Sequence, residues 1–199
     1  MQNRPRKRAP LDAMTPNVER IIAAISYVID EARERGYRVT QYDISKSLFL
    51  ADRSHLNKFG RPVTFDNYVA MENGPVPSLS YDFLKEDAGA IRRYRVAIPW
   101  TRTPAPDISP RAYSYEISKT QVITDALSPS DLDELRAAII VVKSLGFQQV
   151  RRLTHDDQAY IEAWDGEAEA KNNHMSLSLM FDVPNEEAAK ELAFLSKHL

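Results

Sequence analysis

Asp52 and His55 form the first candidate for chemistry in this sequence, because they lie three residues apart within a predicted helix. Side chains at that spacing meet on one helix face, and a carboxylate beside an imidazole could form half of a metal site. A complete site needs more ligands, and the other histidines are His155, His174 and His198, with no cysteine in the chain. We therefore expect a structural role, with His55 in the core and Asp52 as the candidate partner of its hydrogen bond.

The run Thr154–Asp157 is the second candidate, because it places His155 beside two carboxylates. Carboxylates can raise the pKa of a histidine towards neutrality, as acid–base catalysis requires. The same run is typical of a helix start, with Thr154 as the cap and acids in the first turn. We favour this structural interpretation, since the sequence contains no nucleophile elbow, no glycine-rich phosphate loop and no HExxH motif. No catalytic, metal-binding or cofactor-binding residue is predicted, and an enzyme is the third hypothesis.

Trp100 is the candidate for contact with a macromolecular partner. It opens the segment 100–111, which contains three prolines and is predicted to be an exposed loop. Tryptophan and arginine are enriched at binding hot spots, so the arginines of this region are further candidates. These are Arg93, Arg95 and Arg102, with Arg92 and Arg111 around the same predicted hairpin. Two alternatives stay open: Trp100 could fold back onto the sheet, and the arginines could form the wing of a DNA-binding protein.

Hydrophobic periodicity and capping residues predict a mainly helical fold. Helices are expected at about 15–36, 40–60, 78–85, 128–146, 148–153, 154–164 and 185–199, with caps at Thr15, Thr40, Ser78, Ser128, Thr154 and Asn185. Short strands are expected at 68–71, 91–99 and 113–117, with a turn at 73–77, and the alternation within 175–183 also favours a strand. The helix at 40–60 carries apolar residues on two faces, which predicts that neighbours bury it on both sides. The fold class is therefore α+β, a single mainly helical domain with a small antiparallel sheet of about three strands.

The composition of the 199-residue chain, with 43% hydrophobic and 27% charged residues, is ordinary for a globular protein. The absence of cysteine excludes disulfides and thiolate metal sites. No apolar run approaches the roughly 18 residues that a membrane span needs, and the N-terminus lacks a signal-peptide core, so we expect a cytoplasmic protein with no membrane partner. Residues 1–14 are predicted to be a disordered basic arm and residues 15–199 a single domain. Because that domain is acidic, nucleic acid is not the expected partner.

An ordered series of short motifs resembles the Panacea domain of bacterial antitoxins, and most closely the SocA-like members. The motifs are LFLADR at 48–53, FGRP at 59–62, YVAM at 68–71, GPVP at 74–77, YDFL at 81–84 and LSPSDLDEL at 127–135. The residues at signature positions are Asp52, His55, Gly60, Gly74, Pro75, Thr154, His155 and Trp164. The resemblance covers about 18–165 and leaves 166–199 as a C-terminal extension.

This resemblance implies function by protein binding. Panacea antitoxins neutralise a cognate toxin by direct contact, and SocA-like members act as adaptors that deliver the toxin to the ClpXP protease. The family has no catalytic residues to carry over, so most signature residues are expected to maintain the fold. The leading hypothesis is an antitoxin whose partners are a toxin and ClpX or ClpXP, and the alternative is a DNA-binding transcriptional regulator. The sequence leaves the identity of the toxin and the oligomeric state open.

Overall fold

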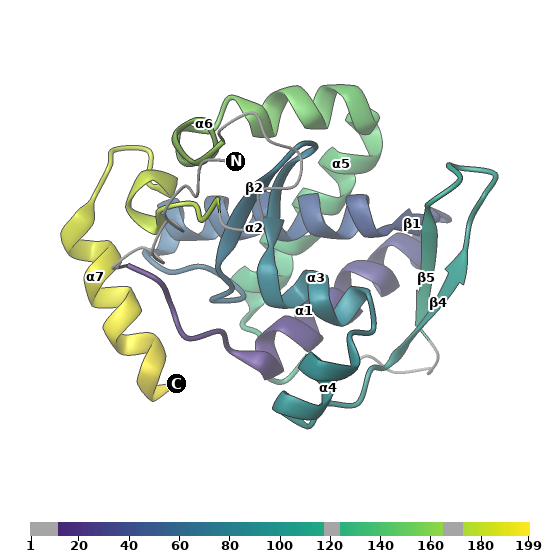
Figure 1. Ribbon diagram of the computed structural model, residues 1–199, viewed down its shortest axis with the longest axis horizontal. Helices are drawn as coiled ribbons and strands as arrows, with labels where there is room; N and C mark the ends of the chain where they lie inside the picture. The colour runs from purple at the N-terminus through teal and green to yellow at the C-terminus, as the bar shows by residue number, and fades with distance from the viewer. Residues whose placement is uncertain (1–11, 118–123, 165–172) are drawn as a thin grey trace, which may run out of the picture.

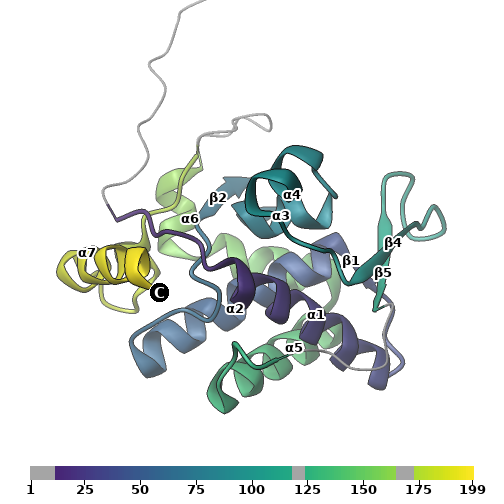
Figure 2. The ribbon, with the colours of Figure 1, turned by 90° about the horizontal axis from the view of Figure 1, so that it is seen from below.

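Three long helices form the centre of the molecule (Figures 1 and 2). The computed structural model describes residues 12–117, 124–164 and 173–199. The long helices are α1 (Val18–Glu34), α2 (Gln41–Phe59) and α5 (Pro129–His155). α2 packs against both α1 and α5, and side chains on two of its faces are buried. The predicted burial of this helix on both sides is therefore confirmed.

The ends of α2 and the start of α5 follow from their capping residues. Thr40 and Asp43 form a capping box at the start of α2, and Gly60 ends that helix in the left-handed conformation with φ of 77°. Ser128 and Asp131 form the same box at the start of α5. Each cap satisfies backbone N–H groups that would otherwise lack a partner, so these predicted boundaries are confirmed.

A three-stranded antiparallel sheet lies at one end of the helical centre (Figure 1). Its strands are β1 (Val39–Thr40), β4 (Trp100–Pro104) and β5 (Tyr113–Ile117), in the order β1-β5-β4. The predicted number of strands is confirmed, but the predicted strand at 91–99 is wrong. Its first part belongs to helix α4 (Ala88–Tyr94), capped by the Asp87 side chain, and the strand begins where a loop was expected.

The remaining elements cover the faces of the long helices. The strands β2 (Tyr68–Met71) and β3 (Gly74–Pro77) form a separate hairpin, so the predicted turn at 73–77 is wrong from Gly74 onwards. The short helices are α3 (Ser78–Leu84), α6 (Gln158–Ala163), α7 (Glu186–Leu195) and the 3-10 turns η1 (Leu177–Met180) and η2 (Ser196–His198).

Several local predictions differ from the structure because a more distant side chain supplies the hydrogen bonds. Asp66 accepts hydrogen bonds from the backbone N–H groups of Leu79 and Ser80, so the start of α3 is capped from outside the helix and Ser78 is not its cap. The segment 175–183 contains the 3-10 turn η1 at its centre instead of a strand, and the carboxylate of Asp12 accepts from the backbone N–H of Ser178.

Two predicted helix starts are displaced along the chain. Asn17 caps α1, two residues after the predicted position, because its side chain accepts from the backbone N–H of Arg20. Asp157 caps α6, whereas the predicted cap Thr154 lies inside the last turn of α5. The cap of α7 is Asn185, as predicted.

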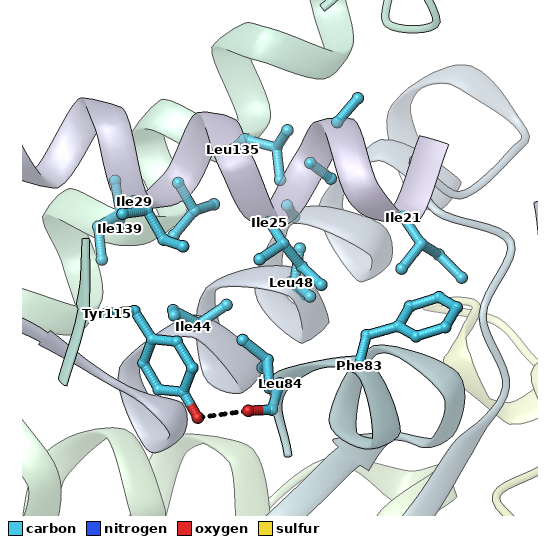
Figure 3. Packing of buried hydrophobic residues seen from close by; sticks show 14 of the residues in the cluster. Ile21, Ile25, Ile29, Ile44, Leu48, Phe83, Leu84, Tyr115, Leu135 and Ile139 are labelled. Atoms are coloured by element: carbon cyan, nitrogen blue, oxygen red, sulfur yellow. Dashed lines mark hydrogen bonds between the residues drawn. The ribbon is translucent and has the colours of Figure 1, made fainter. Parts of the chain in front are cut away.

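Two hydrophobic clusters make up the core of the described residues, one on each side of α2. The larger lies between α1, α2, α5 and the three-stranded sheet (Figure 3). Its members include Ile21, Ile25, Ile44, Leu48, Phe83, Tyr115, Leu135 and Ile139. The hydroxyl of Tyr115 donates to the carbonyl of Leu84 at 2.8 Å, which gives this buried ring a polar partner. The smaller cluster joins α2 to α6, η1 and α7.

The N-terminal boundary of the packed domain lies earlier than predicted. Asp12 and Met14 are both buried, and the backbone N–H of Met14 donates to the side chain of Asn67 at 2.8 Å. The prediction of a disordered arm is therefore wrong for residues 12–14, while residues 1–11 lie outside the described part of the chain. Among the described helices, none combines the length and apolarity that crossing a bilayer requires.

Candidate functional site

His55 lies in a buried polar network between α2 and α5. Its Nδ1 donates to the carbonyl of Arg61 at 2.7 Å, and its Nε2 lies 3.0 Å from the hydroxyl of Ser130 and 3.1 Å from a carboxylate oxygen of Asp131. Burial lowers the pKa of His55. The predicted burial of His55 is confirmed, but the predicted bond to Asp52 is wrong.

Asp52 connects α2 to the segment that precedes β2. Its carboxylate accepts hydrogen bonds from the backbone N–H groups of Val63 and Thr64 and from the hydroxyl of Tyr68, all within 2.9 Å. Burial raises the pKa of Asp52 to about 6 against the effect of these bonds. Both oxygens are occupied, so Asp52 has no capacity left for a ligand.

Asp131 is fully buried and accepts bonds from several donors at the start of α5. Arg20 and Arg61 form ion pairs with it at 2.6 and 2.9 Å, and the Ser128 hydroxyl donates to it at 2.8 Å. Burial by itself would raise its pKa, but the bonds from Arg61, Ser128 and Arg20 together hold the pKa at about 2. The described residues contain no group of three His, Asp or Glu side chains arranged to hold a metal ion.

A second set of signature residues meets around Lys46, a residue that the sequence motifs did not indicate as a site. The ammonium of Lys46 donates to the carbonyl of Pro75 at 2.8 Å. A Cβ atom built on Gly74, whose φ is 101°, would lie 2.7 Å from that Nζ and 2.8 Å from the hydroxyl of Thr154. Gly74 is therefore required both for its backbone conformation and for the close approach of Lys46 and Thr154.

Lys46 is one of the most buried side chains of the protein, with 1% of its surface exposed. Burial, and then the nearby charge of Arg151, lower its pKa well below the usual value. The ring of Tyr42 lies 5.3 Å from its Nζ. No carboxylate forms an ion pair with Lys46 in the part of the chain that the structure describes.

His155 and Trp164 extend this cluster through Tyr160. The rings of His155 and Tyr160 lie 4.3 Å apart, and the ring of Trp164 stacks 6.0 Å from that of Tyr160. The hydroxyl of Tyr160 donates to the carbonyl of Met71 in the β2–β3 hairpin. Burial, Arg151 and Lys46 lower the pKa of His155, and its buried Nε2 has no hydrogen-bond partner among the described residues.

A pocket of about 580 Å³ opens beside Lys46, and we call it the hairpin pocket. It lies between the tip of the β4–β5 hairpin, the start of α2, the β2–β3 turn and Gly146, where non-helical backbone angles interrupt α5. Its lining includes Gln41, Tyr42, Asp43, Ser45, Lys46, Glu72, Val76, Tyr81, Ile108, Arg111, Tyr113, Lys143 and Phe147. Ile108 and Phe147 at its rim are 48% and 52% exposed. The buried hydroxyl of Ser45 has no hydrogen-bond partner among the described residues.

The sequence contained one signal for this site. Lys46 lies four residues after Tyr42 and three before Phe49, within one of the two apolar stripes of the predicted helix. A basic residue at that position must be buried when both faces of the helix are covered. No such local signal indicated Ile108 or Phe147, because their proximity depends on how α5 and the hairpin pack.

The predicted contact residue Trp100 does not lie at the surface. It is 4% exposed in the larger core cluster, so the alternative of a tryptophan folded onto the sheet is the one observed. Arg93 and Arg95 belong to α4 and its end, so their predicted placement at the hairpin is wrong. Arg102 does lie on β4, with its guanidinium 3.5 Å from the ring of Tyr113, which lines the hairpin pocket.

The chain matches the model of one known protein family. The family described as antitoxin SocA-like, Panacea domain, matches residues 44–161, which is more than half of the sequence. The chain belongs to this family. No curated protein and no solved structure matches it. The matched region begins after α1, whereas the motifs suggested a start near residue 18, and it includes most of the lining of the hairpin pocket.

Membership in the SocA-like Panacea family supports an antitoxin role, and an antitoxin implies a toxin as its partner. Both polar clusters described above contain signature residues. Asp52 and His55 belong to the one between α2 and α5, and Gly74, Thr154 and His155 belong to the one beside the hairpin pocket. The second cluster differs from the first because a pocket opens next to it.

Proposed function

We propose that this protein is an antitoxin that neutralises its cognate toxin by direct binding, without catalysis, and that the hairpin pocket with its rim is the contact surface. The family match supports the antitoxin role. The observation that carries the choice of surface is the 580 Å³ pocket with two half-exposed apolar side chains, Ile108 and Phe147, at its rim. Concave sites with an apolar rim favour burial of a partner's side chains.

Growth rescue tests the antitoxin role. The open reading frame that neighbours this gene should arrest growth when expressed alone, and co-expression of this protein should restore growth. Purified toxin and antitoxin should then associate in size exclusion and calorimetry. Growth arrest that this protein does not relieve, together with no measurable association, contradicts the proposal.

We also propose delivery of the toxin to ClpXP in the cytoplasm, on the basis of the resemblance to SocA-like antitoxins. Degradation of the purified toxin by ClpXP should be faster with this protein than without it. A stable toxin in both reactions would leave neutralisation by binding alone, because masking of the toxin needs no protease.

The DNA-binding alternative has less support than toxin binding. α2 is covered on two faces, so it is not free to enter a groove, and Arg93 and Arg95 lie on α4 instead of a wing. If the alternative were correct, the affinity for DNA should fall steeply between 50 and 200 mM salt, by orders of magnitude for about six phosphate contacts. Binding without that salt dependence would argue against a nucleic-acid interface.

A further inference from the structure

Two basic side chains next to the hairpin pocket, Lys46 and Arg151, make their hydrogen bonds to backbone carbonyls and not to carboxylates. Lys46 donates to the carbonyl of Pro75, and Arg151 donates to the carbonyl of Glu72 at 3.2 Å. Within the described residues, neither forms an ion pair. His155 stands in the same group, and the charges of Arg151 and Lys46 lower its pKa. Lys46 and Arg151 therefore lie beside the pocket without a paired carboxylate among the described residues.

The carboxylates that line the pocket do not neutralise this charge. Asp43 is engaged in the capping box of α2 and in an ion pair with Lys143 at 3.2 Å. Glu72 is exposed, and its backbone carbonyl, rather than its carboxylate, is the partner of Arg151. An ammonium has three donors, and the described part of the chain accepts one hydrogen bond from Lys46. Lys46 thus has donor capacity left, and it lines the pocket.

Resting on the function proposed above, we propose that the hairpin pocket binds one acidic side chain of the toxin, with Lys46 as its ion-pairing partner and the Ser45 hydroxyl as a second donor. Lys46 and Ser45 both line the pocket and both are at least nine-tenths buried. Burial without a counter-ion disfavours the ammonium form of Lys46, and a carboxylate that enters the pocket stabilises that form. The unused hydroxyl of Ser45 gains a partner in the same step.

The surroundings of the pocket favour a carboxylate on a polypeptide over a polyanion. Ile108 and Phe147 at the rim offer apolar surface to the residues that flank an acidic side chain. A nucleic acid would bring many charges against Asp43, Glu72 and a chain of net charge −2. A single carboxylate held between apolar neighbours pairs with Lys46 and avoids this repulsion.

Three variants of the antitoxin test the proposal through the Kd for the toxin, measured by calorimetry. Lys46→Met removes the charge and retains the length of the side chain, and we expect it to weaken binding by about thirtyfold or more. Ser45→Ala removes a hydroxyl that has no partner in the described structure, and we expect about tenfold weaker binding with no loss of thermal stability. Ser47→Ala is the matched control, because Ser47 is buried on the same helix but donates to the carbonyl of Asp43.

A scan of the toxin identifies the acid. Each Asp→Asn or Glu→Gln variant of the toxin is titrated with wild-type antitoxin and with Lys46→Met. One toxin variant should bind the wild-type antitoxin at least tenfold more weakly than the unmodified toxin does. The same toxin variant should lose little further affinity when the antitoxin carries Lys46→Met, because both changes remove the same interaction. If Lys46→Met does not fold, Ser45→Ala takes its place in this double-mutant cycle.

The outcomes separate this inference from the proposed function. If wild-type antitoxin does not bind the toxin, the proposed function fails. If it binds, and Lys46→Met and Ser45→Ala retain its Kd while folding normally, only the acidic-side-chain inference fails. If the double-mutant cycle is additive for every acidic side chain of the toxin, the inference also fails. It fails as well if extending the toxin C-terminus is the one change that lowers affinity, because the ligand is then the terminal carboxylate and not a side chain.

Discussion

At the scale of single residues, two buried carboxylates show how the donors around a charge determine its pKa. Asp52 and Asp131 are both fully buried. Asp131 lies against the guanidinium groups of Arg20 and Arg61, and its pKa falls to about 2. Asp52 accepts bonds from neutral donors, and its pKa rises to about 6. Opposite charge compensates desolvation where neutral hydrogen bonds do so incompletely.

The raised pKa of Asp52 predicts a specific pH dependence of stability. The folded protein binds this proton more tightly than the unfolded chain does, so the contribution is present below pH 3.8 and is lost as the pH rises through about 6. The loss amounts to about 3 kcal/mol at pH 7. Relative to wild type, Asp52→Asn should therefore gain about 2.5 kcal/mol of unfolding free energy between pH 4 and pH 7 in urea titrations, because about 0.5 kcal/mol is already lost at pH 4. Parallel pH profiles of the two proteins would contradict the shift.

Gly74 and Gly36 form a matched pair for a second prediction. Both have positive φ, but a Cβ on Gly36 meets no described atom within 4 Å, whereas one on Gly74 meets Lys46 and Thr154 below 3 Å. Gly36→Ala should cost about 1 kcal/mol of unfolding free energy from backbone strain alone. Gly74→Ala should cost about 3 kcal/mol, because it also displaces buried polar groups. Equal losses in denaturant titrations would show that the close packing around Lys46 is not needed.

At the scale of elements, α5 is interrupted at Gly146 and continues in a new direction. Gly146 has φ of 72° and ψ of 174°, a combination that is almost restricted to glycine. The break separates the capped half of the helix, which packs on α1 and α2, from the half that carries Phe147 and Arg151. It therefore places a rim residue of the hairpin pocket and one of the nearby cations.

The break at Gly146 predicts that stability and toxin binding are lost together. Gly146→Ala should lower the free energy of unfolding by about 1–3 kcal/mol and weaken toxin binding, because alanine resists this backbone conformation and Phe147 shifts. Gly60→Ala is the control, since its φ of 77° and ψ of 6° lie in the ordinary left-handed region at the far end of α2. We expect Gly60→Ala to cost stability while the Kd stays unchanged. Wild-type affinity in folded Gly146→Ala would contradict a role of the break at the site.

At the scale of the whole molecule, exposed apolar side chains occur at both ends of the long axis. The hairpin pocket lies near the β4–β5 hairpin, and α7 lies at the opposite end (Figure 1). Phe147 at the pocket is 52% exposed and Phe194 on α7 is 61% exposed. Exposed apolar side chains of this size mark candidate contact surfaces, and their placement at opposite ends lets each be tested separately.

Phe147 and Phe194 give a direct comparison of the two ends. Phe147→Asp should weaken toxin binding at least tenfold, because it places a charge in an apolar contact and removes the ring next to Tyr42. Phe194→Asp should leave the Kd unchanged. Calorimetry and growth rescue with both variants measure the difference. The reverse result would place the toxin on α7 and contradict the choice of the hairpin pocket.

The sequence by itself determined the features that depend on neighbours along the chain. The capping boxes at Thr40 and Ser128 and the glycine stop at Gly60 located the ends of the central helices, because a cap and its backbone donors are within a few residues of each other. Apolar periodicity predicted that α2 is buried on both sides. The order and content of the short motifs were enough to indicate the Panacea family.

Tertiary structure decided the rest, because distant side chains compete with local preference. Asp66 caps a helix that a local serine was expected to cap, and Trp100 is buried by helices that its own segment does not reveal. Lys46 becomes a site because the β2–β3 hairpin brings the Pro75 carbonyl to its ammonium, and because Lys46 and Thr154 both close in on the space where Gly74 has no side chain. Burial, charge pairing and the shape of a pocket are properties of all the neighbours in space, and a linear pattern specifies just those that are also neighbours in sequence.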